Sequence, residues 1–500
     1  MSSIPRALAA GAGRQFSVGL PLFLIALFVL IAMGNYLAGE RYAPVIASGL
    51  LLAQLFLVLR HWRLAVYVLF VYVILEGFII NYFGARGELN LIKDGLVITV
   101  FVALLFRLVV LRQPLFAAAP WKVPLAGYAL LYTFQVFNPA LPSITVGLIG
   151  LRVTLLFVAC ALVGYWFFFR REIARDFLRV QMVVSIPVSI FGIMQYFLGP
   201  AWLLSISPGF ERTIFYAGGR TAREVTFRTI STFASTGGFS SYLWFTIILT
   251  FAFYRLTRNP AMRVLALGSL ALQGVAMLTT GGRGSVVWLG LTFLVMALLM
   301  RRLRNLTMAG ALAFVVFFLA VQVLGGSILG RYGTILDYDL VVTRNAPLLL
   351  QISAAMQTPP EGLGAGRTSS AGYRYAPNME IISVENHFAK ARYEAGLAGL
   401  LLFTLTFAVM GGHVITTFLR LKDPELRWLG AVATSIVLTI MLTFPLGNGL
   451  DIPPINFYFW FLLGMVYALL RIQHVEQDAQ AAAAKRAPDR QAALLPLQAR

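Results

Sequence analysis

The chain has 500 residues, of which 59% are hydrophobic and 12% are charged, and 40 Lys and Arg against 20 Asp and Glu give it a net charge of +20. Soluble domains are about half apolar and about one quarter charged, so the composition excludes a soluble protein and predicts one that crosses a membrane repeatedly. The lone cysteine, Cys160, excludes an intramolecular disulfide and a thiolate metal cluster.

Runs of about 17 to 25 mostly apolar residues are long enough for a helix to cross the hydrocarbon, whereas strands of a membrane barrel alternate over about ten residues. The fold class is therefore all-α, an integral membrane protein with about 14 transmembrane helices, within a range of about 12 to 14. The first run follows Arg6 and Arg14 and lacks a small-residue cleavage site, so it is expected to stay as a span. In chain order the runs lie near residues 17–38, 43–59, 63–84, 91–111, 121–138, 145–169, 177–199, 238–256, 262–281, 284–300, 306–329, 395–419, 427–446 and 454–472.

Lys and Arg collect in every second loop, as the positive-inside rule expects of cytoplasmic loops. This pattern places both termini in the cytoplasm, with loops of more than about 15 residues on the outer face. Much of the net charge therefore sets topology and implies no nucleic-acid partner. The expected parts are a seven-helix region at 1–199, a first outer loop at 200–237, helices eight to eleven at 238–329, a large outer loop folded as a small helical cap at 330–394, helices twelve to fourteen at 395–472, and a cytoplasmic tail at 473–500 that is disordered or weakly helical at the surface.

Ionisable residues within the predicted spans gather in the outer half of the membrane. They are Glu76, Lys93, Asp94 and Arg152, and each costs at least about 2.5 kcal/mol near a helix centre. One interpretation is a set of buried ion pairs that fix helix packing, Glu76 with Arg152 or Lys93 with Asp94. The other is a polar vestibule open to the outer face.

The predicted outer loops carry a surplus of basic residues that topology does not require, and an anionic ligand would explain it. Two arginines stand out. Arg228 lies in a Phe- and Thr-rich segment before a Gly-Gly pair, and Arg283 lies in a tight turn whose neighbours include Gly284, so that its backbone can approach an oxyanion. The others, individually expected to be solvated, are Arg212, Arg220, Arg223, Arg331, Arg344, Arg367, Arg374, Lys390 and Arg392.

His387 is the one histidine predicted to face outward, either as a surface residue or as a general base. The run Gly362-Leu363-Gly364-Ala365-Gly366 is compatible with phosphate but lacks the strand and spacing of a nucleotide loop. The sequence contains no HExxH motif, no carboxylate cluster spaced for a metal and no GxSxG motif. No metal or other cofactor is therefore expected.

In order along the chain, four landmarks resemble the bacterial O-antigen ligase and O-antigen polymerase superfamily of polytopic membrane glycosyltransferases. They are FRTISTFASTGGFSSYL with Arg228, TTGGRGSVVWL with Arg283, GLGAG with Gly364 and Gly366, and ENHFAKARYEAGLAGLLLF with His387 and Glu394. The resemblance covers roughly residues 200 to 445. At the distance from Glu394 where ligases carry His-Asn, this chain has Glu385 and Asn386, so Glu385 rivals His387 for the catalytic role.

The resemblance implies a reaction at the periplasmic face of the bacterial inner membrane, without metal or nucleotide. The donor would be a glycan on undecaprenyl pyrophosphate and the acceptor a glycan or lipid-linked glycan. Arg228 and Arg283 would hold the pyrophosphate, His387 or Glu385 would be the base, and the anomeric centre would invert. The stretch EGFIINYFGARGELNLIKDGL favours polymerisation of repeat units into exopolysaccharide or O-antigen. The alternatives are a ligase that transfers glycan to lipid A core or another acceptor, an anionic-solute transporter, and a structural scaffold.

Overall fold

A computed structural model describes residues 43–83, 89–211, 213–214, 227–301, 332, 338–369, 376 and 382–494. Two predicted spans, at 17–38 and 306–329, lie outside these residues. So do five of the outer basic residues, Arg212, Arg220, Arg223, Arg331 and Arg374. Contacts divide the chain into two compact units, unit 1 with residues 1–115 and 188–239, and unit 2 with residues 116–187 and 240–500.

Unit 1 is built on two helices that pack against each other, α3 (Ala43–Tyr82) and α4 (Asn90–Val110). α3 is broken at His61, where the backbone leaves the helical region. The unit also contains the second part of α8 (Arg171–Ile206), which is broken at Gly199, and the short helix η4 (Pro208–Phe210), which packs on α3.

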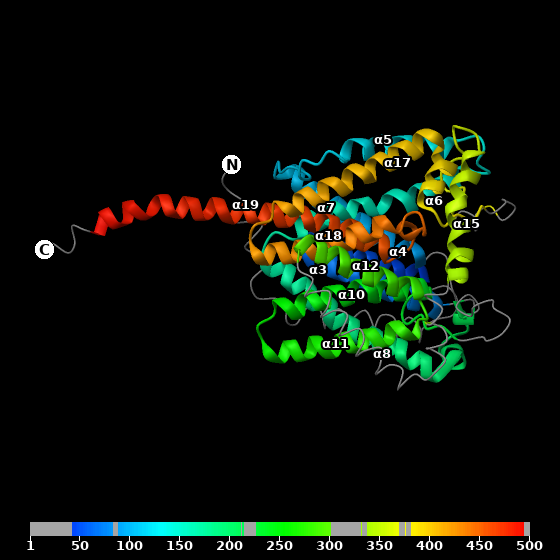
Figure 1. The fold of residues 1–500 in the computed structure, drawn as a ribbon, viewed down its shortest axis with the longest axis horizontal. Coiled ribbons are helices and arrows are strands. Elements are labelled where there is room, and N and C mark those ends of the chain that lie inside the picture. Colours follow the sequence, from blue (N-terminus) through cyan, green and yellow to red (C-terminus); the bar gives the residue numbers. More distant parts are fainter. Residues whose placement is uncertain are drawn as a thin grey trace. The chain divides into compact units, whose positions relative to one another are not determined.

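Unit 2 is a bundle of helices in which α7 packs on α19, α5 on α17, and α18 on α12, α17 and α19. Figure 1 shows α5 and α17 running side by side, with α15 near one end of α17. Its elements are α5 (Lys122–Phe134), η2 (Gln135–Phe137), α6 (Ile144–Leu155), η3 (Leu156–Val158), α7 (Ala159–Phe167), the first part of α8, most of α10 (Thr236–Leu256), α11 (Pro260–Thr279), α12 (Arg283–Met300), α15 (Tyr338–Met356), α17 (His387–Leu419), α18 (Pro424–Leu442), η6 (Gly449–Asp451) and α19 (Ile455–Leu494).

Within the described residues, 9 helices are long and apolar enough to cross a membrane, and each matches a span predicted from hydropathy. The predicted span 91–111 forms helix α4. This helix is not among the nine, because it carries three charges, Lys93, Asp94 and Arg107. The predicted span 121–138 is a 13-residue α-helix, α5, followed by a 3₁₀ turn. The all-α membrane fold is therefore confirmed, with 9 spanning candidates in the described part of the chain.

α17 shows how sequence spacing separates a lipid-facing stripe from a packed face. Leu397, Leu401 and Leu405 recur every four residues and are exposed, as expected for one side of a helix that faces hydrocarbon. Phe403 and Phe407 lie on the other side, are buried, and contact each other. The side of α17 that carries Phe403 also faces the cavity described below.

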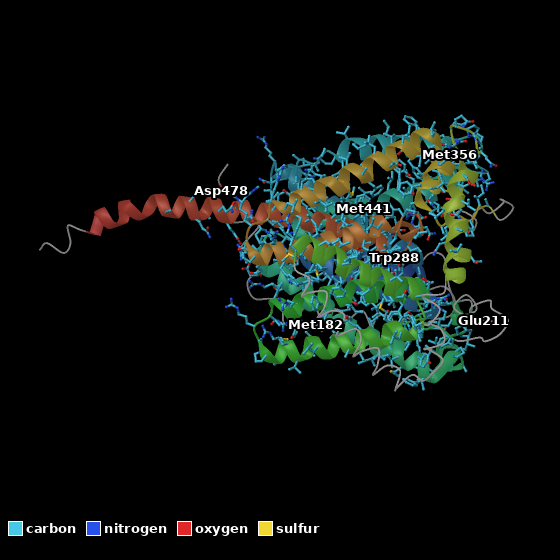
Figure 2. All side chains as sticks on the ribbon, in the orientation of Figure 1. Met182, Glu211, Trp288, Met356, Met441 and Asp478 are labelled. Carbon is cyan, nitrogen blue, oxygen red and sulfur yellow. The ribbon has the colours of Figure 1, made fainter. Side chains whose placement is uncertain are left out.

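The tail, predicted to be disordered or weakly helical, is helical as far as Leu494, because α19 continues beyond the end of its apolar segment. An alanine run at 481–484 favours this continuation, since alanine has the highest helix propensity. In Figure 1 this part of α19 extends past the other helices of unit 2, and Figure 2 shows Asp478 on it, whereas Met441 of α18 lies among the side chains of the bundle.

Candidate functional site

α17 begins eight residues earlier than the predicted span, at His387, because Asn386 caps it. The Asn386 side-chain oxygen accepts hydrogen bonds from the amides of Phe388 (2.9 Å) and Ala389 (3.1 Å). Asparagine is a favoured N-cap for this reason. Its side-chain nitrogen donates to the Leu348 carbonyl of α15 (3.1 Å) and the Pro445 carbonyl after α18 (2.9 Å). The cap therefore fixes the start of α17 against two other parts of unit 2.

The glycine run 362–366 packs by its backbone onto a break in α17 at Gly396. Gly396 has φ +72°, and a Cβ there would lie 2.1 Å from the Pro360 carbonyl oxygen. A Cβ at Gly362, with φ +85°, would lie 2.5 Å from the Gly396 nitrogen. Only glycine permits so close a crossing of two chain segments in this conformation. Two landmarks that are separate in the sequence are thus one structural unit.

The amides of this run are already used inside the protein. The Leu363 amide donates to the Tyr393 carbonyl (2.7 Å), the Gly364 amide to the Glu394 carbonyl (3.1 Å), and the Ala365 amide to the Gln135 carbonyl (3.1 Å). Gly366 packs on α6, where a Cβ at Gly150 would lie 2.2 Å from the Gly366 nitrogen. The arrangement joins α6 and α17, and these three amides do not point at an open phosphate site.

Glu394 is fully buried and clamps the same loop to α5. One carboxylate oxygen accepts from the Thr368 amide (3.0 Å) and hydroxyl (2.8 Å), and the other accepts from the Tyr132 hydroxyl. A buried carboxylate is costly unless hydrogen bonds satisfy it, and here both oxygens are bonded. Its contacts are those of a residue that positions the loop.

This crossing gives a stability prediction with a control in the same helix. Gly396→Ala is expected to destabilise the protein by about 2 kcal/mol or more, since it adds a backbone clash to a strained φ. Gly412→Ala is the control, because its Cβ would meet nothing within 4 Å. Thermal unfolding in detergent measures both, and equal midpoints would contradict the crossing.

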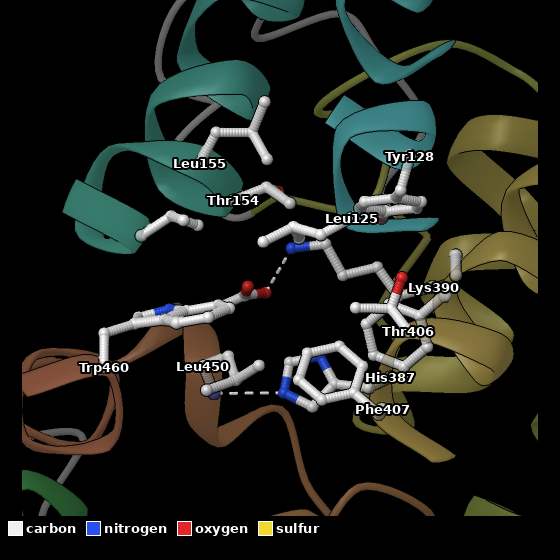
Figure 3. A pocket seen from close by; sticks show the side chains of 14 residues that line it. Leu125, Tyr128, Thr154, Leu155, His387, Lys390, Thr406, Phe407, Leu450 and Trp460 are labelled. Atoms are coloured by element: carbon white, nitrogen blue, oxygen red, sulfur yellow. Dashed lines mark hydrogen bonds and ion pairs between the residues drawn. The ribbon is translucent and has the colours of Figure 1, made fainter. Parts of the chain in front are cut away.

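A small cavity lies beside the first turns of α17, with a volume of about 30 Å³. It is lined by residues of α5, α6, η3, α17, η6 and α19, and of the site candidates named from the sequence it includes His387. Figure 3 shows His387, Lys390 and Thr406 from α17 on one side and Thr154 and Trp460 on others.

The polar groups of this cavity are paired with one another. The Lys390 ammonium lies 2.5 Å from a carboxylate oxygen of Asp451, and the two side chains are 7% and 19% exposed. The Leu450 amide donates to Nε2 of His387 (3.0 Å), and both contacts are drawn in Figure 3. The His387 ring lies edge-on to Phe444, with 5.0 Å between centroids. The site is an ion pair and an imidazole held at the end of an apolar bundle.

Glu385, the rival to His387, has an exposed side chain, and its amide donates to the Gln351 side chain of α15 (2.9 Å). It does not line the cavity.

Arg392, counted with the outer basic surplus, is buried and donates to the carbonyls of Pro359 (2.9 Å) and Thr358 (2.7 Å). Lys390 and Arg392 are therefore both engaged within the protein.

Arg283 is the first residue of α12 and is half-buried. The turn before it is tight: Gly281 has φ +60°, and the Gly282 amide donates to the Thr280 hydroxyl (3.0 Å). Gly284 is exposed on the next position of the helix. Arg152 lies in the last turn of α6 and is also half-buried. The backbone turn predicted around Arg283 is present.

In unit 1, Glu76 of α3 and Lys93 of α4 form a buried ion pair at 2.6 Å. This pairing differs from both pairs considered from the sequence, because α3 and α4 pack side by side and bring the two residues together. Asp94, next to Lys93, is also buried. The pair accords with the packing interpretation of these charges, while a role in a vestibule stays a prediction.

The segment after Arg228 is held in the core of unit 1. Gln195 of α8 accepts from the Ser231 amide (2.7 Å) and donates to the Ser231 carbonyl (2.9 Å). The Thr232 hydroxyl donates to the Ile74 carbonyl of α3 (2.7 Å). Arg228 itself is half-buried at the beginning of this fixed segment. Its motif is therefore rigidly placed within the unit.

Sequence reasoning missed Asp451. It lies in the short segment between the last two predicted spans, 61 positions from Lys390, and no periodicity links the two. An acidic residue in an otherwise uncharged connection, predicted to lie on the outer face, is the one available signal.

The protein is a multi-pass helical membrane protein, as its helix lengths and hydropathy show. A comparison with models of known protein families finds no match, and a comparison with curated proteins finds none either.

Proposed function

We propose that the protein is a glycosyltransferase that polymerises lipid-linked oligosaccharide repeat units into exopolysaccharide or O-antigen, at the periplasmic face of a bacterial inner membrane. The observation that carries the proposal is the docking of the GLGAG loop on the Gly396 break. It joins two landmarks of the O-antigen ligase and polymerase resemblance at helix α17, whose first residue, His387, lines a cavity that contains the ion pair of Lys390 with Asp451.

The proposed reaction is one inverting displacement. The oxygen of an acceptor sugar hydroxyl forms a bond to the anomeric carbon of the donor glycan. The bond from that carbon to the undecaprenyl pyrophosphate breaks, and its electron pair leaves with the pyrophosphate. The hydroxyl proton passes to a base of the protein. Pyrophosphate is a good leaving group, so stabilising its charge is the main requirement.

Arginine suits that requirement, because a guanidinium can bind phosphate oxygens with two hydrogen bonds. We propose Arg283 for this role, supported by its position at a helix start behind a glycine turn. We propose the same role for Arg228, on the basis of its sequence motif. His387 supports the choice of the cavity as the acceptor side of the site, since it lines that cavity and Glu385 does not.

Deleting the gene in its native host and restoring it tests this function. We expect the deletion strain to accumulate single lipid-linked repeat units and to lose long surface polysaccharide, with both restored by the wild-type gene. Long lipid-linked chains with a bare acceptor would instead indicate a ligase. Normal glycans with altered uptake of an anionic solute would indicate a transporter, and normal glycans and uptake would contradict all three functions.

A further inference from the structure

The base of the proposed reaction can be chosen by asking which group at the cavity has a lone pair to accept a proton. Among the residues that line the cavity, His387 is the sole imidazole and Asp451 the sole carboxylate. The ammonium of Lys390 binds Asp451. The choice therefore lies between the ring of His387 and the carboxylate of Asp451.

The lone pair of His387 is already occupied. A neutral imidazole has one nitrogen with a lone pair and one that carries a proton. Nε2 accepts the Leu450 amide hydrogen at 3.0 Å, so the proton lies on Nδ1 and the ring presents a donor. Phe444 and Phe403 pack on the ring, 5.0 Å and 6.2 Å between centroids, and hold it in this orientation.

The carboxylate of Asp451 differs from the His387 ring, because it can accept further hydrogen bonds. A carboxylate accepts several hydrogen bonds, and Lys390 contacts one oxygen, Oδ2, in the described structure. The carboxylate therefore lies in the cavity wall with the Lys390 ammonium on one side of it. Leu450, the donor to His387, is the adjacent residue in η6, so His387 and Lys390 both hold this turn.

The cavity is small. Its volume, about 30 Å³, has room for a group the size of a water molecule. Thr154 and Thr406 add hydroxyls to its lining. A hydroxyl group placed in this cavity would lie beside the Asp451 carboxylate.

We infer that Asp451 is the catalytic residue that takes the proton of the acceptor hydroxyl, and that Lys390 and His387 are positioning residues that hold its turn. The inference rests on the proposed glycosyl transfer. The acceptor oxygen bonds to the anomeric carbon, the carbon to pyrophosphate bond breaks with its electrons leaving on the pyrophosphate, and the proton moves to the Asp451 carboxylate.

The test uses full-length protein in lipid nanodiscs with a lipid-linked oligosaccharide as donor and acceptor, and measures both initial rate and thermal unfolding. We expect Asp451→Asn to lower the rate by about 100-fold or more, the usual contribution of a general base, with Asp451→Glu retaining more activity. His387→Gln keeps a side-chain oxygen for the Leu450 amide and is expected to stay within about tenfold of wild type.

Removing one member of a buried pair can unfold a protein, so the decisive variant is the exchange Lys390→Asp with Asp451→Lys. It keeps an ion pair but moves the carboxylate onto α17. We expect it to unfold near the wild-type temperature and to be as slow as Asp451→Asn. An exchange variant with wild-type activity would show a purely structural pair and overturn the inference, as would a His387→Gln rate as low as that of Asp451→Asn. Wild-type protein that fails to transfer glycan would contradict the proposed function itself.

Discussion

Replacing Arg283 with alanine is expected to lower the formation of glycan polymer by about 100-fold or more, because removing one donor to a developing anion typically costs this much. Arg283 begins α12 behind the Gly281-Gly282 turn, so its side chain extends from a backbone that can approach a ligand closely. Arg283→Lys keeps the charge but loses the two-pronged geometry and is expected to give an intermediate rate. The measurement is the length distribution of lipid-linked glycans in the complemented deletion strain.

Arg258→Ala is the matched control. Arg258 is exposed in the connection between α10 and α11, at the opposite end of α11 from Arg283. The loop between the predicted spans 238–256 and 262–281 is one of the basic loops expected in the cytoplasm, so the loss of Arg258 is expected to leave polymer length unchanged. If Arg283→Ala and Arg258→Ala both give polymer of wild-type length, Arg283 does not bind the leaving group.

Gly464→Leu is expected to prevent most of the protein from folding, with a loss of stability of about 3 kcal/mol or more. α7 and α19 cross so closely that a Cβ at Gly464 would lie 2.2 Å from the Ala161 carbonyl oxygen, and one at Gly164 would lie 2.2 Å from the Phe461 carbonyl oxygen. Small residues allow such backbone approach between membrane helices. The obstructing atoms belong to the backbone, so the movement of a side chain cannot relieve the clash.

The yield of monodisperse protein in size-exclusion chromatography measures this effect. Gly412→Leu is the control, since Gly412 is exposed on α17 and a Cβ there meets nothing within 4 Å. It is expected to match wild type, because leucine is a better helix former than glycine. Equal yields for Gly464→Leu and Gly412→Leu would show that the two helices do not cross at these glycines.

The membrane fold could be predicted from hydropathy alone, because a helix that crosses hydrocarbon needs a long apolar run and the sequence shows it. Helix boundaries were harder. The predicted span begins at 395, whereas α17 begins at His387, because Asn386 caps the helix and tertiary hydrogen bonds hold the polar side chains within 387–394. Hydropathy along the sequence does not detect a polar helical turn that neighbouring segments bury.

The site was predicted less completely, because contacts between distant segments leave little trace in one sequence. His387 could be found from its position before the predicted span at 395–419, and Glu394 from its motif. The pairing of Lys390 with Asp451 depends on how η6 meets α17, and the pairing of Glu76 with Lys93 depends on how α3 packs on α4. The sequence associates the glycines at 364 and 366 with phosphate, but the Gly364 amide donates to the Glu394 carbonyl and Gly366 packs on the backbone of α6.

The central claim is transfer of glycan from a polyprenyl pyrophosphate. The most direct measurement combines the purified wild-type protein in liposomes with a lipid-linked repeat unit from the native host, and follows lipid-linked glycans and free undecaprenyl pyrophosphate by mass spectrometry. We predict lipid-linked dimers and longer chains, with one undecaprenyl pyrophosphate released for each new linkage. A repeat unit that stays single, with no pyrophosphate released, would contradict the claim.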